Sequence, residues 1–290
     1  MKGIILAAGK GTRLYPASKH ISKILLPVYD KPMIYYPLST LMSAGIRDFM
    51  VIVSKDDKDY FKRLLGNGEQ FGISIKYKVQ KVQRGIADAL LVAEKFIEED
   101  MVALALGDNI FYGDELYEHL AQAIAEPTGA TIFCKKVEDP RAFGVAEVDY
   151  EGKVLSLEEK PQVPKSEWAA TGLYVYDKDA CRFAKMLKPS ARGELEITDL
   201  NKIYLEEGKL KAQLLEDDVL WADTGTFESL LEASNAIHDL EFTKHMIIGS
   251  PEVVALTRGF ITKNKLTQWA EMHPSNPYYD NLRLLTHEKK

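Results

Sequence analysis

Short apolar runs alternate with helix-like segments along the first half of this chain, and this order is the strongest constraint on its fold. Strand-like runs lie at residues 2–7, 49–53, 73–79, 101–106 and 130–135. Segments with apolar residues at helical spacing lie between them, at residues 33–44, 55–65, 86–96 and 116–125. A βαβα order predicts an α/β fold, in which helices cover both faces of a mostly parallel sheet. Ligands of such sheets bind beyond the carboxyl ends of the strands.

The pattern changes after Val137, where strands begin to follow one another directly. Residues 144–150 and 154–157 predict a β-hairpin, because a turn containing Gly152 lies between them. One more strand and two helices are expected at residues 169–176, 196–206 and 227–238. From about residue 241 onward the chain is helical but less regular. We therefore expect one α/β domain at residues 1–240 and a C-terminal helical extension at residues 241–290.

The composition narrows the class of protein. The formal net charge of the 290 residues is -6, so neither a nucleic acid nor an anionic membrane is an expected partner. The two cysteines, Cys134 and Cys181, offer no zinc-ligand spacing, which favours buried thiols in a reducing compartment. The N-terminal apolar run is too short for a signal peptide, and no stretch is long enough to span a membrane. We therefore expect a cytoplasmic protein.

A glycine-rich turn follows the first expected strand directly, in the string LAAGKGTRL at residues 6–14. Gly9 and Gly11 allow the backbone to approach a phosphate group closely and to point N–H groups at it. Arg13 adds a guanidinium fork for phosphate oxygens, and Lys23 adds a second cation. The spacing fits neither a Walker A loop nor the GxGxxG dinucleotide fingerprint. A turn that only connects a strand to a helix stays as the alternative.

Two aspartates occupy transitions from an apolar run to a turn. Asp108 follows the expected strand at 101–106, and Asp223 precedes a Thr-Gly pair. Carboxylates at strand ends, beside a phosphate-binding turn, suit Mg²⁺, which proteins commonly hold together with substrate phosphates. A turn or N-cap role is the alternative for either aspartate.

The glycine-rich turn, followed by a K-x-L-x-P-V element that begins at Lys23, resembles the signature of the sugar nucleotidylyltransferase superfamily. Along nearly its whole length the chain more closely resembles the glucose-1-phosphate thymidylyltransferase family. The strings that carry this resemblance are YDKPMIYYPL at 29–38, LGDN at 106–109, LEEKP at 157–161, ARGELEITD at 191–199 and WADTGT at 221–226. Close family members usually have Gly where Ala8 stands, and the wider superfamily accepts Ala there.

The resemblance implies a Rossmann-like, three-layer α/β/α nucleotidyltransferase fold with a mixed, mostly parallel central sheet. It implies that residues 1–240 are the catalytic domain, which joins dTTP to glucose 1-phosphate and releases dTDP-glucose and pyrophosphate. The sugar phosphate would attack the α-phosphorus in line, so positioning and charge neutralisation matter more than a protein nucleophile. A homo-oligomer, either a tetramer or a dimer, is also implied.

The resemblance also assigns roles to residues of this sequence. Catalysis is expected from Arg13, Lys23 and Lys160, and Mg²⁺ is expected on Asp108 and Asp223. The residues expected to contact the nucleotide are Leu6, Ala8, Gly9, Gly11, Thr12, Arg13, Gln80, Gly85 and Asp108. Those expected to contact the sugar phosphate are Gly144, Glu159, Lys160, Thr171, Gly172 and Arg192. Local composition alone would make Glu158-Glu159-Lys160 a solvated charged turn.

The expected base site departs from the close family. Gln80 and Gly85 match the family pattern, and a Gln side chain can hydrogen-bond the polar edge of a pyrimidine. Residues 81–84, however, replace a loop that often contains Pro and Ser, and Asp88 stands where Gln is usual. Thymine and uracil differ by one methyl group, which a pocket distinguishes by only ~1–3 kcal/mol. A UTP-using enzyme that makes UDP-glucose therefore stays open.

Other activities are weighed against the same residues. Residues 216–220, EDDVL, stand where the family often carries an arginine of an end-product site, and acidic residues there would repel a nucleotide diphosphate. We therefore expect weak or no inhibition by dTDP-rhamnose. An inactive paralogue that senses sugar nucleotides would carry damage at Arg13, Lys23, Asp108 or Asp223, and none is visible. The lack of GxGxxG argues against a dehydrogenase.

Overall fold

The computed structural model describes residues 1–126, 128–273 and 275–287, and a sheet of nine strands lies at its centre. The strands of this sheet are β1 (Lys2–Ala7), β4 (Asp48–Val53), β5 (Ser74–Val79), β6 (Val102–Leu106), β8 (Ala130–Lys136), β9 (Gly144–Val148), β10 (Val154–Glu159), β11 (Trp168–Tyr176) and β12 (Leu210–Leu215). Two separate pairs of short strands are β2 (Pro27–Val28) with β3 (Lys31–Pro32), and β7 (Asn109–Tyr112) with β13 (Leu220–Asp223).

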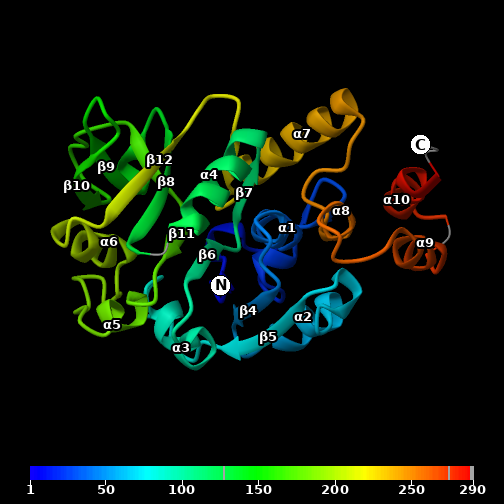
Figure 1. Ribbon diagram of the computed structural model, residues 1–290, viewed down its shortest axis with the longest axis horizontal. Coiled ribbons are helices and arrows are strands. Elements are labelled where there is room, and N and C mark those ends of the chain that lie inside the picture. The colour runs from blue at the N-terminus through cyan, green and yellow to red at the C-terminus, as the bar shows by residue number, and fades with distance from the viewer. Residues whose placement is uncertain (127, 274, 288–290) are drawn as a thin grey trace.

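The helices lie between and after these strands (Figure 1). They are α1 (Tyr35–Ser43), α2 (Lys58–Leu65), α3 (Asp88–Ile97), α4 (Asp114–Ala125), α5 (Ala180–Ala184), α6 (Ile197–Glu206), α7 (Phe227–Lys244), α8 (Pro251–Thr257), α9 (Lys263–Glu271) and α10 (Pro277–His287). Short 3-10 turns occupy Thr12–Leu14, Lys23–Leu25, Glu69–Phe71 and Pro140–Ala142.

The central sheet is mixed, as predicted. Along the order β10-β9-β11-β6-β1-β4-β5, the strands β6, β1, β4 and β5 are parallel, whereas β11 runs antiparallel to β6. β8 pairs antiparallel with β11 and parallel with β12. The carboxyl ends of the parallel strands therefore meet at one edge, where an α/β sheet binds its ligands.

Each face of the sheet is covered by its own set of helices, because successive strand residues point to opposite sides. Ile5 and Ala105 face a core formed with α1, α2, α4 and α7, which continues into the C-terminal helices. Ile4 and Leu104 face a second core, formed with α3, α5 and α6. Cys134 and Cys181 belong to the second core as free, buried thiols, and burial raises the pKa of Cys134 to about 12. This arrangement is the predicted three-layer α/β/α fold.

The helices and strands predicted from periodicity are present, with shifted ends. Helix α2 begins at Lys58 rather than at residue 55, because the Asp57 carboxylate accepts hydrogen bonds from the Ser22 backbone at 2.9 Å and the Ser54 hydroxyl at 2.6 Å. Helix α7 runs on to Lys244, so it crosses the expected domain boundary at residue 240. Strands β2, β3, β7, β12 and β13 and helix α5 were not predicted from the sequence.

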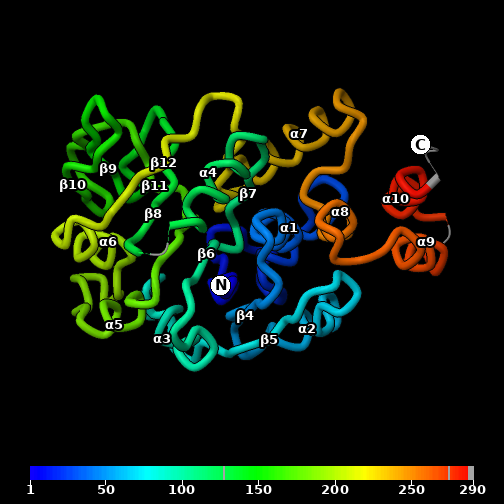
Figure 2. The backbone as a smooth tube through the Cα atoms, viewed as in Figure 1, coloured from blue at the N-terminus to red at the C-terminus, as the bar shows by residue number. Residues whose placement is uncertain are grey.

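The C-terminal helices α8, α9 and α10 lie at the end of the molecule opposite β9 and β10 (Figure 2). Their apolar residues Ala255, Leu266 and Leu282 are buried in the core that also contains α1. Gly249 lies against Tyr36 of α1, since a Cβ atom there would stand 2.3 Å from Tyr36 Cδ1. The extension therefore completes the core of the α/β domain. Residues 274 and 288–290 of the expected extension lie outside the described residues.

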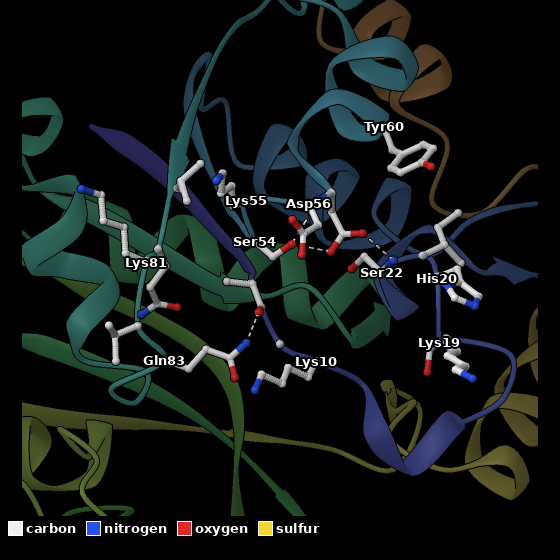
Figure 3. Close-up of a pocket in the computed structure, with 18 of the residues that line it drawn as sticks. Lys10, Lys19, His20, Ser22, Ser54, Lys55, Asp56, Tyr60, Lys81 and Gln83 are labelled. Atoms are coloured by element: carbon white, nitrogen blue, oxygen red, sulfur yellow. Dashed lines mark hydrogen bonds between the residues drawn. The ribbon is translucent and has the colours of Figure 1, made fainter.

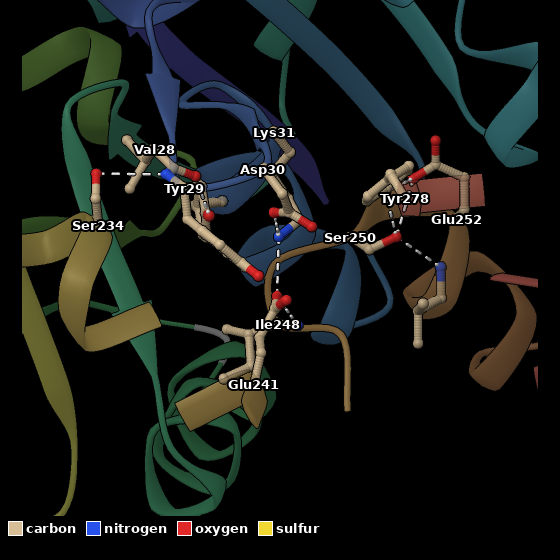
Figure 4. A network of polar contacts seen from close by, with 12 residues as sticks. Val28, Tyr29, Asp30, Lys31, Ser234, Glu241, Ile248, Ser250, Glu252 and Tyr278 are labelled. Atoms are coloured by element: carbon tan, nitrogen blue, oxygen red, sulfur yellow. Dashed lines mark hydrogen bonds and ion pairs between the residues drawn. The ribbon is translucent and has the colours of Figure 1, made fainter. Parts of the chain in front are cut away.

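Two buried polar contacts lie near this end of the chain: one ties α7 to the β2–β3 segment, and the other ties α8 to α10 (Figure 4). Lys31 is 2% exposed and forms ion pairs with Asp30 and, at 2.9 Å, with Glu241 of α7. Glu252 of α8 is equally buried, and its Oε2 accepts hydrogen bonds from the Tyr278 hydroxyl at 2.7 Å and the Ser250 hydroxyl at 3.0 Å. Of the helices in the described parts of the chain, none has both the length and the apolar character needed to cross a membrane.

Candidate active site

Two cavities lie at the carboxyl ends of the parallel strands. The larger, of about 1320 Å³, is lined by the turn after β1, by residues 15–22, by residues 54–60 after β4 and by residues 79–83 at the end of β5 (Figure 3). The smaller, of about 650 Å³, lies beyond β6 and is lined by Arg13 together with residues of β9, β10, β11 and β13. The glycine-rich turn contributes to both linings, with Ala8, Gly9 and Lys10 in the larger cavity and Arg13 in the smaller one.

The glycine-rich turn presents open backbone to the larger cavity. No atom lies within 4 Å of the place where a Cβ of Gly9 would stand, so a ligand can approach the backbone there. Gly11 has a left-handed φ of +61°, and a Cβ at this position would stand 3.0 Å from the Lys23 side chain. The Ser18 hydroxyl donates to the Gly11 carbonyl at 2.6 Å. Gly11 thus shapes the turn and lets Lys23 pass beneath it.

Arg13 reaches from the turn into the smaller cavity. Its guanidinium lies over Gly225, where a Cβ atom would stand 2.5 Å from Arg13 Nη2. Gly225 belongs to the WADTGT string at residues 221–226. The structure therefore brings two of the strings that resemble the family, the glycine-rich turn and WADTGT, into contact.

Asp108 and Asp223 converge because the short strands that adjoin them pair with each other. In the β7–β13 ribbon Asp223 stands opposite Asn109, and the Thr224 backbone N–H donates to the Asp108 carbonyl at 3.0 Å. Lys23 forms an ion pair with the Asp108 carboxylate. Burial raises the pKa of Asp223, and the nearby Asp108 charge raises it further, whereas Lys23 and Arg13 act in the opposite direction. Two carboxylates and two cations therefore meet at one point.

This point suits a divalent metal ion. Among the described residues, no group of three or more His, Cys, Asp or Glu side chains is arranged as a metal site. Mg²⁺ does not require one, since it is usually held by one or two carboxylates, water and substrate phosphates. Burial is the largest cause of the raised pKa of Asp223, and the charge of Asp108 adds to it. Asp108 and Asp223 therefore fit the expected ion by donor type, number and charge.

Glu159 is held on the far side of the smaller cavity, at the end of β10. Its Oε2 accepts a hydrogen bond from the Thr198 hydroxyl at 2.5 Å, and its Oε1 accepts one from Arg192 at 3.2 Å. Arg192 also binds Glu196 at 2.7 Å and Glu194 at 3.5 Å, and the hydrogen bond to Glu196 raises the pKa of Arg192. These contacts fix a carboxylate and a guanidinium beside each other, which is a suitable pair for a sugar phosphate.

Lys160 has a left-handed backbone, with φ at +48°, which is unusual for a residue other than glycine. A backbone hydrogen bond to the Phe143 carbonyl at 2.9 Å holds this conformation. The side chain lines the smaller cavity, where its charge acts to lower the pKa of Asp223. A strained residue that the surrounding structure holds in place is often a functional one.

Three residues predicted for the sugar side line the same cavity: Gly144, Thr171 and Gly172. Gly172 has φ at +77° within the irregular part of β11, and a Cβ there would stand 2.8 Å from Leu106 Cδ1. The Thr171 hydroxyl donates to the Phe133 carbonyl at 2.9 Å, so it is engaged within the sheet. At Gly144 a Cβ would stand 2.8 Å from the Thr198 hydroxyl oxygen. A larger residue at Gly144 or Gly172 would therefore distort this wall.

The predicted base residues are not all placed alike. Gln80 lines the larger cavity and donates to Asp88 at 2.8 Å, and Gln83 donates to the Ala8 carbonyl across the turn (Figure 3). Gly85 lines neither cavity. Its φ is +97°, and a Cβ there would stand 2.4 Å from the Leu195 carbonyl oxygen, so its glycine is explained by packing alone.

The two cavity linings bring together most of the predicted site residues. Ala8, Gly9, Arg13, Gln80, Asp108, Gly144, Glu159, Lys160, Thr171, Gly172 and Asp223 line one or the other. The linings of these two cavities leave out Leu6, Gly11, Thr12, Lys23, Gly85 and Arg192. Lys23 and Arg192 still reach the cavity through their ion pairs with Asp108 and Glu159.

Several lining residues had no predicted role. Thr198 positions Glu159, and the Trp221 ring N–H donates to Asn109 at 2.6 Å, next to Asp108. Thr198, Trp221 and Asn109 lie inside the strings that carry the resemblance, which were the only signal that could have identified them.

The sequence of this chain is similar to those of known proteins. A family model described as nucleotidyl transferase matches residues 2–240. A glucose-1-phosphate thymidylyltransferase of Neisseria meningitidis is 53% identical, with 96% of each chain covered. That of Mycolicibacterium smegmatis is 48% identical, over 99% of this chain and 100% of the relative.

Solved structures point the same way. A Bacillus anthracis protein assigned as a glucose-1-phosphate thymidylyltransferase superposes with a TM-score of 0.77 at 43% identity, covering 82% of this chain and 96% of that one. A UDP-glucose pyrophosphorylase in complex with UDP-glucose gives a TM-score of 0.73 at 25% identity, covering 82% and 98%. With its glycine-rich turn, its paired aspartates and these relatives, the chain belongs to the glucose-1-phosphate thymidylyltransferases of the nucleotidyl transferase family.

Proposed function

We propose that this protein transfers the thymidylyl group of dTTP to glucose 1-phosphate, forming dTDP-glucose and releasing pyrophosphate. The observation that carries the proposal is the meeting of two carboxylates and two cations in the wall of the smaller cavity, where Asp108, Asp223 and Arg13 line it and Lys23 pairs with Asp108. Nucleotidyl transfer needs both signs of charge at one point, since carboxylates hold a cation while Lys and Arg neutralise phosphate oxygens. The names of the relatives supply the nucleotide and the sugar phosphate.

Each cavity suits one substrate. The larger cavity has the open backbone of Gly9 for the triphosphate and the Gln80 amide for the base. The smaller cavity has Lys160, and Arg192 behind Glu159, for the sugar phosphate. Glu159 can accept hydrogen bonds from sugar hydroxyls, and the backbones of Gly144 and Gly172 line the same wall.

In the proposed reaction, an oxygen of the sugar phosphate attacks the α-phosphorus of dTTP in line. A new P–O bond forms, the bond to the β-phosphate oxygen breaks, and pyrophosphate leaves with the electron pair. Arg13 would bind oxygens of the triphosphate tail, and Lys23 would lie beside the transferring phosphate. Mg²⁺ held by Asp108 and Asp223 would neutralise phosphate charge when bound. A sugar phosphate is largely ionised at neutral pH, so no strong general base is required.

The experiment that tests the proposal measures pyrophosphate release with glucose 1-phosphate, Mg²⁺ and each of dTTP, UTP, CTP, ATP and GTP. Release with dTTP well above UTP is the expected result. Release mainly with UTP would keep the chemistry and make the product UDP-glucose. No release with any triphosphate would contradict the proposal and favour an inactive, sugar-nucleotide-sensing protein.

We also propose the remaining features of the protein. Residues 1–240 would carry the catalysis and residues 241–290 would form an extension.

Assembly as a homo-oligomer, a tetramer or a dimer, is supported by large exposed side chains on α7, where Leu231 is 62% and Phe242 is 74% exposed. Light scattering after size-exclusion chromatography would test it. The free thiols of Cys134 and Cys181 favour a cytoplasmic location.

Weak or absent inhibition by dTDP-rhamnose is a further part of the proposal. Asp217 is exposed, and its neighbour Glu216 donates its backbone N–H to Glu115 at 3.3 Å, so three carboxylates gather there around one cation, Lys135, which lies 3.9 Å from Asp217. Such a surface disfavours a nucleotide diphosphate. Strong inhibition by dTDP-rhamnose, noncompetitive with dTTP, would contradict it.

A further inference from the structure

Gln80 is anchored by a buried carboxylate that has no role in the proposed reaction. Gln80 is 7% exposed, lines the larger cavity and donates its Nε2 to Asp88 Oδ2 at 2.8 Å. Asp88, the first residue of α3, is 1% exposed. Its other oxygen, Oδ1, accepts a hydrogen bond from Arg84 Nη2 at 2.6 Å. Both carboxylate oxygens are therefore occupied, one by the side chain in the cavity wall and one by an arginine.

These contacts determine which way the Gln80 amide faces. A carboxylate accepts hydrogen bonds and cannot donate them, so Asp88 must receive the NH₂ group of Gln80. The Arg84 guanidinium is permanently charged and donates to the other oxygen of the same carboxylate. Flipping the amide would set the Gln80 carbonyl oxygen against the Asp88 carboxylate, with two acceptors in contact and no donor between them. Gln80 therefore holds a fixed orientation, with Oε1 directed away from Asp88.

A fixed amide can distinguish between pyrimidines in a way that a rotating amide cannot. Thymine and uracil carry an N3–H donor beside the O4 acceptor, whereas cytosine carries an N3 acceptor beside the N4 amino donor. An amide that is free to flip can match either pattern, because it exchanges its donor and acceptor. An amide with Oε1 held in one place matches the first pattern and opposes the second.

We propose that Asp88 is a positioning residue that fixes the Gln80 amide, so that the enzyme accepts thymine or uracil and rejects cytosine. This inference rests on the proposed placement of the base at Gln80. The Gln80 amide would not contact the methyl group that distinguishes thymine from uracil, so the inference makes no prediction about the preference for dTTP over UTP. Asp88 itself would not touch the substrate.

The competing role for Asp88 is purely structural. A carboxylate in the first turn of a helix, paired with an arginine four residues earlier, stabilises the helix start whatever nucleotide is bound. Losing such a contact would lower stability, and would lower activity with every triphosphate by a similar factor. A change in the ratio between two nucleotides is the result that the structural role does not produce.

The test compares kcat/KM for dTTP and dCTP in the full-length protein, with glucose 1-phosphate and Mg²⁺. Asp88→Asn keeps the size of the side chain but can donate as well as accept, so it releases the Gln80 amide. We expect the dTTP-to-dCTP preference to fall by roughly 10- to 100-fold, the value of a good bidentate base contact. Most of the change should come from a lower KM for dCTP.

The matched control is Arg84→Lys, which keeps a cation beside Asp88 and leaves the Gln80 contact in place. Its dTTP-to-dCTP preference should stay within about twofold of that of the unchanged protein, because a lysine at the exposed end of the pair can still bind Asp88 and the Gln80 contact is kept. If Asp88→Asn does not fold, the double variant with Arg84→Gln also removes the unpaired arginine charge and carries the same test. An unchanged preference in a folded Asp88 variant would overturn the inference.

Gln80→Ala separates this inference from the proposed base placement. If Gln80→Ala leaves the KM for dTTP unchanged, the base does not bind at Gln80 and the placement itself fails. If Gln80→Ala raises that KM while Asp88→Asn keeps its preference, the placement stands and only the positioning role of Asp88 is lost.

Discussion

The Arg13 guanidinium lies directly over Gly225, so closely that a methyl group on Gly225 would stand 2.5 Å from Arg13 Nη2. One residue belongs to the glycine-rich turn and the other follows Asp223, more than 200 positions later in the chain. The position of the arginine thus depends on the absence of a side chain in the turn that follows β13, the strand that ends at the expected metal ligand Asp223.

Gly225→Ala should therefore displace Arg13 without removing any charged group. We expect kcat/KM for dTTP to fall by about 100-fold, the size of effect that a 1 Å misplacement can have. Steady-state kinetics with varied dTTP would measure this, and a thermal melt would verify the fold. Unchanged kinetics in a folded variant would mean that Arg13 does not need its observed position.

Asp108→Asn and Asp223→Asn should each lower kcat by about 10²–10³-fold, as expected when one charged contact to the reacting phosphates is lost. Asn keeps the shape of each side chain, so binding of glucose 1-phosphate, measured by calorimetry, should change little. Removal of divalent metal by a chelator should abolish activity in the unchanged protein, and added Mg²⁺ should restore it. Full activity in the chelated protein would rule out the metal.

Lys160 allows the role of its charge to be separated from that of its backbone. Lys160→Ala and Lys160→Gly both remove the ammonium group, and each should lower kcat/KM for glucose 1-phosphate by roughly 10- to 100-fold, the value of a charge-assisted hydrogen bond. Only Gly tolerates the left-handed φ of +48° freely, so the Gly variant should be more stable than the Ala variant by ~1 kcal/mol. Chemical unfolding measures this difference, and equal stabilities would argue against strain at this position.

Burial of Glu252 predicts a pH dependence of stability. Burial raises the pKa of Glu252, and its Oε1 has no hydrogen-bond partner. The groups around it are Tyr278, Tyr35, Tyr279, Ser250 and Lys31. The folded protein therefore holds the proton more tightly than the unfolded chain does. The stabilising contribution is full below the unfolded pKa of ~4.3, and it is lost as pH rises through the folded value.

Glu252→Gln cannot lose a proton, so it should gain stability relative to the unchanged protein between pH 5 and pH 8. The gain should approach ~1.4 kcal/mol for each unit by which folding raises the pKa. Urea unfolding at the two pH values measures it. Glu232→Gln, on the exposed side of α7, is the control and should show no such change. A constant difference between Glu252→Gln and the unchanged protein would contradict the prediction.

The spacing of apolar residues along the sequence was sufficient to predict the main strands and helices of the α/β domain. The limits of β1 agree with the predicted strand at residues 2–7. A short apolar run that leads into a glycine-rich turn is typical of a strand buried inside a parallel sheet. The β7–β13 ribbon could not be predicted from the sequence. Its strands have four residues each and pair across about a hundred positions, so neither has a periodicity of its own.

The site shows the same limit. Local composition predicts a solvated turn at Glu159. Its side chain is nevertheless only 22% exposed, because Thr198 of α6, 39 positions away in the sequence, hydrogen-bonds to it. The pairing of Lys23 with Asp108 likewise depends on two loops that meet only in the folded chain. For Gly85 a ligand contact was predicted, and the packing against Leu195 already explains the glycine.

The contact of Gly249 with Tyr36, and that of Lys31 with Glu241 across 210 positions, has a consequence for biosynthesis. A ribosome delivers the amino-terminal part of the chain first. Lys31 and helix α1 would then emerge long before α7 and α8, so Lys31 would lack Glu241 and the apolar face of α1 would lack the residues that cover it. Native packing around α1 should consequently form only after synthesis is nearly complete.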